Sequence, residues 1–126
     1  TLMISMHKSG DIIYKAKDKP QGLFIIHSGS IEILTKSGVQ LATLNEGEIF
    51  GEISEILAED RSVTARAKTD CSLMHIETSA IETKLKTTDP AIKGIIRALA
   101  LRLSETSRKY EVLWDELQIY KSLKPK

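Results

Sequence analysis

Short apolar segments separated by turn residues make up the first three-fifths of the chain. The clearest is residues 22–27, a nearly continuous apolar run that predicts a strand buried on both sides. A strand followed by a turn recurs along this region, and the other predicted strands are residues 12–14, 31–35, 39–44, 62–67 and 71–76. Many short strands with turns every eight to twelve residues or so indicate a β-sandwich or a β-barrel.

Helical patterns occupy the last two-fifths of the chain. Thr78 is suited to cap a short helix. A second helix is expected to begin at Asp89-Pro90, with the aspartate as cap and the proline in the first turn. No proline follows until Pro125, so this helix can run from residue 90 to 120 and would be roughly 45 Å long. Such a length exceeds what a small barrel can cover, so part of the helix should pack on a partner.

The spacing of apolar residues in this long helix indicates what that partner is. The seam follows alternating steps of four and three, at Ile92, Ile96, Leu99, Leu103, Thr106, Tyr110, Leu113, Leu117 and Tyr120. Thr106 is its one polar residue, and setting the coiled-coil register is one role open to it. This heptad seam is typical of a left-handed coiled coil and predicts a homodimer. Packing on the chain's own barrel is the alternative, and other apolar residues leave room for it: Ile95, Leu101, Val112, Trp114 and Ile119.

Composition is that of an ordinary globular protein. The 126 residues suit one domain, with 1–77 as a β-barrel, 78–88 as a short helix and 90–122 as the long helix. The net charge of +1 gives no global attraction to nucleic acid or membrane. One cysteine, Cys71, excludes an internal disulfide and fits a reducing cytoplasm, so we expect a cytoplasmic location. The first residue is Thr1, so a fragment of a longer protein stays open.

Residues 50–65 carry the most specific chemistry. Gly51 allows a left-handed backbone or a close approach to a ligand, and residues 53–57 can form one helical turn whose free amides face an anion. Arg61 offers a planar fork for phosphate oxygens, and Ser62 adds a hydroxyl beside it. Glu52 is a poor neighbour for phosphate but a good acceptor for sugar hydroxyls.

This segment resembles the phosphate-binding cassette of cyclic-nucleotide-binding domains. The matching residues are Phe50, Gly51, Glu52, Arg61, Ser62, Thr64 and Ala67, in the order of the family, and the spacing from Glu52 to Arg61 is also that of the family. Upstream, residues 9–14 resemble the family's first barrel turn, residues 23–29 resemble one of its strands, and Gly47 resembles its glycine before the cassette. The resemblance implies a mainly β fold, a jelly-roll-like β-barrel of the double-stranded β-helix type, followed by C-terminal helices with a long dimerisation helix.

The resemblance also implies a site. Arg61 and the amides of Ile53 and Ser54 would bind the cyclic phosphate, with Ser62 and Val63 beside it, and Glu52 would bind the ribose. Leu41, Ala42 and Leu44 would line the apolar side. The stretch from Arg102 to Ser107 resembles the family helix segment that reads the base, through Thr106 of one subunit and Ser107 of the other. The expected ligand is cAMP, with cGMP as the alternative. We expect no catalytic residue, metal or cofactor.

Two departures from the family pattern leave another function open. Lys17 stands where the family has glycine, in a turn that we expect to lie far from the cassette. Glu55 replaces an apolar residue and could repel a bound phosphate unless it points to solvent. A degenerate, non-binding oligomerisation module is therefore the second class. A cupin-like enzyme is the third class, but this sequence lacks the clustered histidines and carboxylate that such an enzyme uses to bind a metal.

Overall fold

The computed structural model describes residues 2–123, without the side chains of Leu2, Trp114, Gln118 and Tyr120. Its elements, in order, are β1 (Leu2–His7), β2 (Ile12–Tyr14), β3 (Leu23–Ser28), β4 (Ile31–Leu34), β5 (Gln40–Leu44), β6 (Ile49–Phe50), α1 (Glu52–Leu57), β7 (Thr64–Ala67), β8 (Cys71–Ile76), α2 (Thr78–Lys86) and α3 (Pro90–Leu123). The strands pair antiparallel in two four-stranded sheets, β1-β8-β3-β6 and β2-β7-β4-β5. The mainly β architecture with C-terminal helices is confirmed, and closure of the sheets into one barrel stays a prediction.

The hydrophobic pattern predicted most strands but missed two. β1 mixes apolar residues with serine and histidine, and β6 has only two residues, so neither shows a strand period. The expectation that β3 is buried on both sides is wrong. Ile26 is buried there, but His27 and Ser28 are exposed at its end. Neighbouring residues of a strand face opposite sides of the sheet, and this strand also has one end in solvent. The apolar run in the sequence therefore did not correspond to burial on both sides.

The core lies between the two sheets and extends to one end of them. Its buried residues are Ile26, Ile31, Phe50, Ala65, Ala67, Cys71 and Leu73. At the edge of this core the rings of Phe24 and Phe50 stack with centroids 5.1 Å apart, and Tyr14 packs beside both. Burying each large apolar side chain contributes about 1.5–3 kcal/mol. Phe50 directly precedes Gly51, so the core holds the start of α1 in place.

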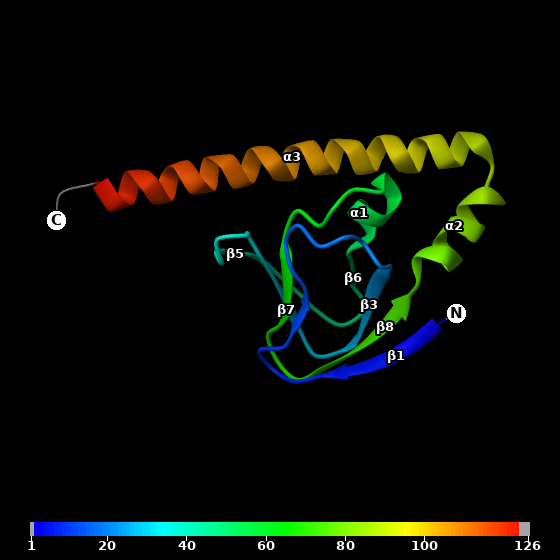
Figure 1. The fold of residues 1–126 in the computed structure, drawn as a ribbon, viewed down its shortest axis with the longest axis horizontal. Helices are drawn as coiled ribbons and strands as arrows, with labels where there is room; N and C mark the ends of the chain where they lie inside the picture. The colour runs from blue at the N-terminus through cyan, green and yellow to red at the C-terminus, as the bar shows by residue number, and fades with distance from the viewer. Residues whose placement is uncertain (1, 124–126) are drawn as a thin grey trace.

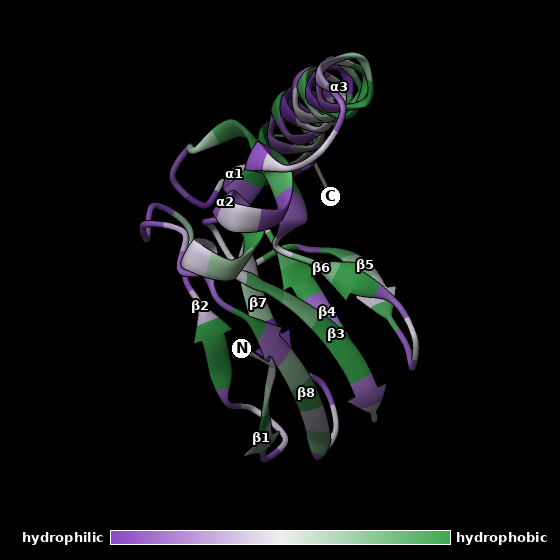
Figure 2. Cartoon of the chain, turned by 90° about the vertical axis from the view of Figure 1, so that its right-hand side faces the viewer, coloured by the Kyte–Doolittle hydropathy of each residue, from purple (hydrophilic) through white to green (hydrophobic). Residues whose placement is uncertain are grey.

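The long helix α3 crosses one end of the sheets, over α1, and extends beyond them (Figure 1; Figure 2 views it nearly end-on). Its 34 residues correspond to about 51 Å at 1.5 Å per residue. The predicted Asp89 cap is confirmed, because the Ala91 amide donates to Asp89 Oδ1 at 2.8 Å. The predicted Thr78 cap is wrong, since α2 begins at Thr78 and its hydroxyl donates to Glu55 Oε1 instead.

The face of α3 toward its own domain differs from the expected one. Ala100 is only 4% exposed, and Ile96 and Ser104 are half-buried. The off-seam residues expected to make this contact are exposed, namely Ile95, Leu101, Val112 and Ile119, while the Trp114 side chain lies outside the described residues. Small side chains at residues 100 and 104 suit close packing of α3 on α1, its main contact. No helix within residues 2–123 has the length and apolar character to cross a membrane.

Candidate functional site

A cavity of about 500 Å³ lies between the segment 49–63, the β4–β5 hairpin and α3. All predicted site residues except Arg102 line it: Leu41, Ala42, Leu44, Gly51, Glu52, Ile53, Ser54, Arg61, Ser62, Val63, Thr106 and Ser107. Tyr14, Ile33 and Tyr110 also contribute to its walls. Tyr14, residues 33–63 and α3 are separated in the sequence and meet around one hollow, whose size suits a small-molecule ligand.

Gly51 forms the hinge between β6 and α1. Its φ of 80° and ψ of 3° are left-handed, and it stands at the N-cap position of α1. A Cβ atom built at Gly51 would lie 2.8 Å from Arg61 Nη1. Glycine is therefore required twice here, by the backbone conformation and by the close approach of the guanidinium.

Arg61 is the central side chain of the site, and only 4% of it is exposed. Its Nη1 donates to the Gly51 carbonyl and to Ser54 Oγ, both at 2.6 Å. Its Nη2 donates to the Gly22 carbonyl at 2.6 Å, and Cζ lies 4.2 Å from the centroid of the Tyr14 ring. The guanidinium is thus held by acceptors from two segments and by a cation–π contact.

One donor of this guanidinium, the buried Arg61 Nε, has no hydrogen-bond partner within residues 2–123. Burial lowers the pKa of Arg61, and nearby Tyr14, Glu55 and Glu52 partly offset that effect. Arginine stays charged in proteins, and an orphaned buried donor calls for a partner that the protein does not itself supply.

The carboxylate and phenol beside Arg61 are also perturbed by burial. Burial raises the pKa of Glu52, and a bond with its own backbone together with the Arg61 charge lowers it only in part. Burial raises the pKa of Tyr14 to about 12, although the Arg61 charge opposes the shift. The Tyr14 hydroxyl is therefore neutral at pH 7. The sequence analysis gave Tyr14 and Gly22 no role in the site, because only folding brings these two residues to Arg61.

The long helix forms the roof of the cavity. Ser104, Thr106, Ser107 and Tyr110 line it from α3. Thr106 donates its hydroxyl proton to the Arg102 carbonyl at 2.9 Å, and the Arg102 side chain is exposed and outside the cavity wall. Arg108 Nη2 donates to Glu59 Oε2 at 2.8 Å, which joins α3 to the loop after α1. Such an exposed ion pair contributes only about 0–1 kcal/mol. The packing of α3 on α1 must therefore supply most of the free energy that holds α3 over the cavity.

The expectation that the Lys17 turn lies far from the cassette is wrong. The Lys17 amide donates to the Arg61 carbonyl at 2.6 Å, and the Arg61 amide donates to the Asp18 carbonyl at 2.7 Å. Lys17 adopts a φ of 79°, the left-handed conformation that the family's glycine would take more readily. A left-handed residue therefore forms this turn, and the turn is bonded directly to the backbone of Arg61.

Glu55 neither lines the cavity nor points to solvent. It is 8% exposed, and its Oε1 accepts hydrogen bonds from the Gly22 amide and from Thr78 Oγ1, the latter at 2.7 Å. The cavity wall does not include it. The predicted repulsion of a bound phosphate by a carboxylate inside the pocket therefore has no basis in this geometry.

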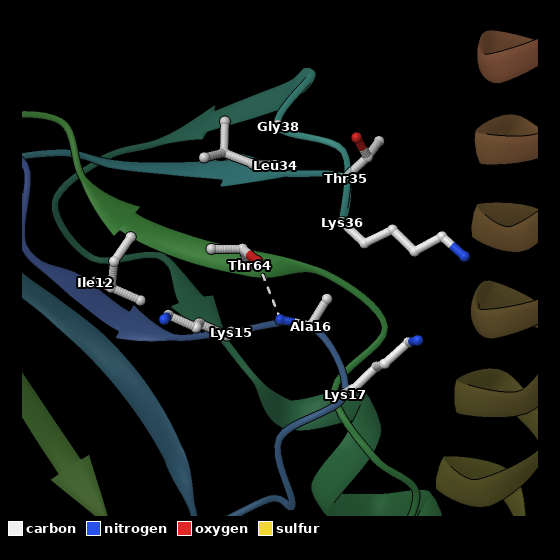
Figure 3. Close-up of a pocket in the computed structure, with 9 residues that line it drawn as sticks. All are labelled: Ile12, Lys15, Ala16, Lys17, Leu34, Thr35, Lys36, Gly38 and Thr64. Carbon is white, nitrogen blue, oxygen red and sulfur yellow. Dashed lines mark hydrogen bonds between the residues drawn. The ribbon is translucent and has the colours of Figure 1, made fainter.

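A second hollow, of about 490 Å³, is lined by three exposed lysines (Figure 3). Lys17 and Lys36 extend toward the side where α3 passes, whereas Lys15 points the other way. Burial raises the pKa of Glu111 on α3, and the positive charge of Lys36 opposes that shift only in part. The ammonium groups do not converge on one point. Among the described residues, no group of three histidine, cysteine or acidic side chains is arranged to hold a metal ion.

The family model described as "Cyclic nucleotide-binding domain" matches residues 6–88, about two-thirds of the chain. The chain belongs to the cyclic-nucleotide-binding domain family. It is 34% identical over 79 residues to a cGMP-dependent protein kinase of Plasmodium berghei, which covers 63% of this chain and 9% of that protein. It is 30% identical over 93 residues to a cyclic nucleotide-gated potassium channel of Mesorhizobium japonicum, which covers 74% of this chain and 25% of that protein.

Solved structures share the arrangement of strands and helices. The cAMP-bound form of the EAL enzyme Bd1971 has a TM-score of 0.75 and 27% identity, over 96% of this chain and 34% of that chain. Its cGMP-bound form has a TM-score of 0.76 and 28% identity, over 94% of this chain and 33% of that one. The regulatory domain of Toxoplasma gondii PKA with cAMP shows the same fold, with a TM-score of 0.68 and 17% identity. The chain spans about a third or less of most of these proteins.

Proposed function

We propose that this domain is a regulatory sensor that binds cAMP in the cavity beneath α3. Within residues 2–123, the observation that carries this proposal is Arg61, a buried guanidinium that lines the cavity and whose Nε has no hydrogen-bond partner. A cyclic phosphate offers the anionic oxygens that such a donor requires. The amides of Ile53 and Ser54 at the start of α1 would add donors, and Ser62 and Val63 would border the phosphate.

Ribose and base recognition follow from the remaining walls. Glu52 lines the cavity, and its carboxylate can accept bonds from the ribose 2′-hydroxyl. The apolar side chains of Leu41, Ala42 and Leu44 form the wall against which the purine would pack. Thr106 and Ser107 would meet the base from α3. We assign Arg102 no contact of its own beyond the carbonyl that receives the Thr106 proton.

The hydrogen bond of Thr106 supports a preference for cAMP over cGMP. Its proton is directed to the Arg102 carbonyl, so the oxygen presents lone pairs to the cavity. An adenine amino group donates and fits that acceptor. A guanine carbonyl needs a donor, and Thr106 could supply one only by breaking its helix bond. We expect a moderate preference, with the contact contributing about 0.5–1.5 kcal/mol.

A cGMP receptor is the second candidate, and Ser62 favours it. Its hydroxyl lines the cavity directly after Arg61 and can accept a bond from a guanine amino group. The likeness to a cGMP-dependent kinase points the same way. Ser62→Ala distinguishes the two, because it should weaken cGMP binding more than cAMP binding if Ser62 reads guanine.

Calorimetric titration with cAMP and cGMP tests the assignment. Arg61→Ala should weaken cAMP binding by about 2–5 kcal/mol, because a buried phosphate then lacks its charge partner. Arg61→Lys is the matched control, since it keeps the charge and loses the fork, and it should fall between the parent and Arg61→Ala. Equal affinity of the parent and Arg61→Ala would remove Arg61 from the site. Absence of binding to the parent would favour the degenerate oligomerisation module.

We also propose that α3 forms a parallel homodimer through its heptad seam. The exposed apolar residues of that seam are Ile92, Leu99, Leu103, Tyr110, Leu113 and Leu117, while the Tyr120 side chain lies outside the described residues. These residues are 39–65% exposed. A continuous apolar stripe of this kind is unfavourable on the surface of a helix in water. A second α3 would cover this stripe and bring Ser107 of one subunit close to the ligand of the other.

Sedimentation analysis tests the dimer. Leu103→Glu should produce monomers because it introduces a charge into the seam. Leu101→Glu is the matched control, since Leu101 is 40% exposed on α3 but lies off the seam, and it should leave the dimer intact. A parent chain that is monomeric at high micromolar concentration with cAMP would contradict the proposal. So would a dimer that both substitutions disrupt equally.

A further inference from the structure

One buried charged group remains outside the cavity. Glu55 and Arg61 are the charged side chains that are buried within residues 2–123, and only Arg61 lines the cavity. Burying a carboxylate is costly unless it is paired or hydrogen-bonded. An apolar side chain would avoid that cost, so the contacts of Glu55 need an account.

Those contacts lead to Arg61 through Gly22. The Glu55 carboxylate accepts the Gly22 amide, and the Gly22 carbonyl accepts Arg61 Nη2 at 2.6 Å. Gly22 thus has Glu55 on its amide side and Arg61 on its carbonyl side. The same carboxylate oxygen accepts the hydroxyl proton of Thr78, the first residue of α2, at 2.7 Å. A continuous hydrogen-bonded chain therefore runs from the start of α2 to the guanidinium.

The main chain at Gly22 has little conformational freedom. Its φ is 126°, and a Cβ atom there would lie 2.2 Å from the Ile76 carbonyl oxygen and 2.5 Å from His75 Nε2. The main chain passes so close to β8 that only glycine fits. The Gly22 amide and the Gly22 carbonyl belong to successive peptide units, and the packing against β8 confines the φ and ψ angles between them. Holding the amide therefore also limits the direction of the Gly22 carbonyl, which accepts Arg61 Nη2.

We propose that Glu55 is a positioning residue for phosphate recognition, which holds the Gly22 main chain and, through it, the Arg61 guanidinium. Thr78 makes this support depend on the first turn of α2. The inference rests on the proposed function, because it takes Arg61 as the phosphate ligand. Glu55 does not touch the ligand; its negative charge also favours the charged form of Arg61.

Guanidinium NMR of the ligand-free, ¹⁵N-labelled chain tests the positioning directly. A guanidinium held by three acceptors should rotate slowly and give separate Nη proton signals, assigned by their loss in Arg61→Ala. Glu55→Gln keeps an acceptor oxygen for Gly22 and Thr78, so it should preserve these signals. Glu55→Leu removes the acceptor and should merge or broaden them. Glu82→Leu, the same change at an exposed position of α2, is the control and should leave them unchanged.

Calorimetry with cAMP tests the consequence for recognition. Glu55→Leu should raise Kd at least about fivefold, and Thr78→Val about two- to fivefold, in line with the loss of hydrogen-bond support. In the Arg61→Ala background the same changes should have less than about a twofold effect, because the group they position is gone. Glu55→Gln should stay close to the parent.

The outcomes separate this proposal from the proposed function. A parent that binds neither cAMP nor cGMP contradicts the proposed function, and the NMR spectra still decide whether Glu55 holds Arg61. Unchanged Arg61 signals in Glu55→Leu overturn the positioning role. An equal loss of affinity with and without Arg61 overturns it as well, since it indicates packing alone. If Glu55→Leu does not fold, an unchanged Kd and unchanged signals in Thr78→Val overturn the chain that links α2 to Arg61.

Discussion

Replacing Lys17 with glycine is expected to stabilise the domain and to leave its ligand site intact. Lys17 has a φ of 79°, and its side chain is exposed, so little packing is lost with it. Its amide bonds to the Arg61 carbonyl, and this contact involves only the backbone. Glycine can therefore keep the turn and the contact with the cassette.

The size of the effect follows from two opposing terms. A left-handed conformation costs a residue with a Cβ atom about 1–2 kcal/mol, and glycine avoids this cost. Glycine loses about 0.5–1 kcal/mol more backbone entropy than alanine on folding. The difference predicts a gain of about 0.5–1 kcal/mol in the free energy of unfolding, or about 2–4 °C in Tm for a domain of this size.

Urea unfolding of the ligand-free chain, followed by circular dichroism, measures this gain. Lys15→Gly is the matched control, because Lys15 is an exposed lysine of the same turn and is not among the residues with positive φ. That control should lose about 0.5–1 kcal/mol. Equal destabilisation by both substitutions would show that the left-handed backbone at Lys17 carries no cost. A cAMP affinity that falls more than about fivefold in Lys17→Gly would show that the lysine side chain itself supports the cassette.

Substitutions at three further residues test the site. Gly51→Ala places a Cβ atom 2.8 Å from Arg61 Nη1 at a φ of 80°, so it should cost about 1–2 kcal/mol in urea unfolding and also weaken cAMP binding. Burial raises the pKa of Glu52, so its ionisation opposes folding as pH rises above its ordinary value. Glu52→Gln should therefore be more stable than the parent at pH 7, converge with it below about pH 4, and discriminate less against 2′-deoxy-cAMP. Tyr14→Phe should keep the cation–π contact and the affinity, whereas Tyr14→Ala should lose about 1–2 kcal/mol of binding in calorimetry.

The cassette and the long helix could be predicted from the sequence because their determinants are local. Gly51, Glu52 and Arg61 lie within eleven residues of one another, in a fixed order around a short helical turn. The helix from Pro90 onward is defined by its cap and by the absence of a breaker, both of which are read along the chain. Its heptad period also indicates which side chains share a stripe, whatever the rest of the fold.

The support of Arg61 was decided only by the tertiary structure. Gly22 lies 39 residues before Arg61, and Glu55 lies 33 residues after Gly22, so their contacts depend on how β3, α1 and α2 pack. The sequence analysis assigned Thr78 to a cap and Glu55 to the ligand or to solvent, since both residues have such local uses. Folding placed them against each other instead, because a buried carboxylate must find donors, and the nearest ones come from segments that periodicity and motif order do not connect.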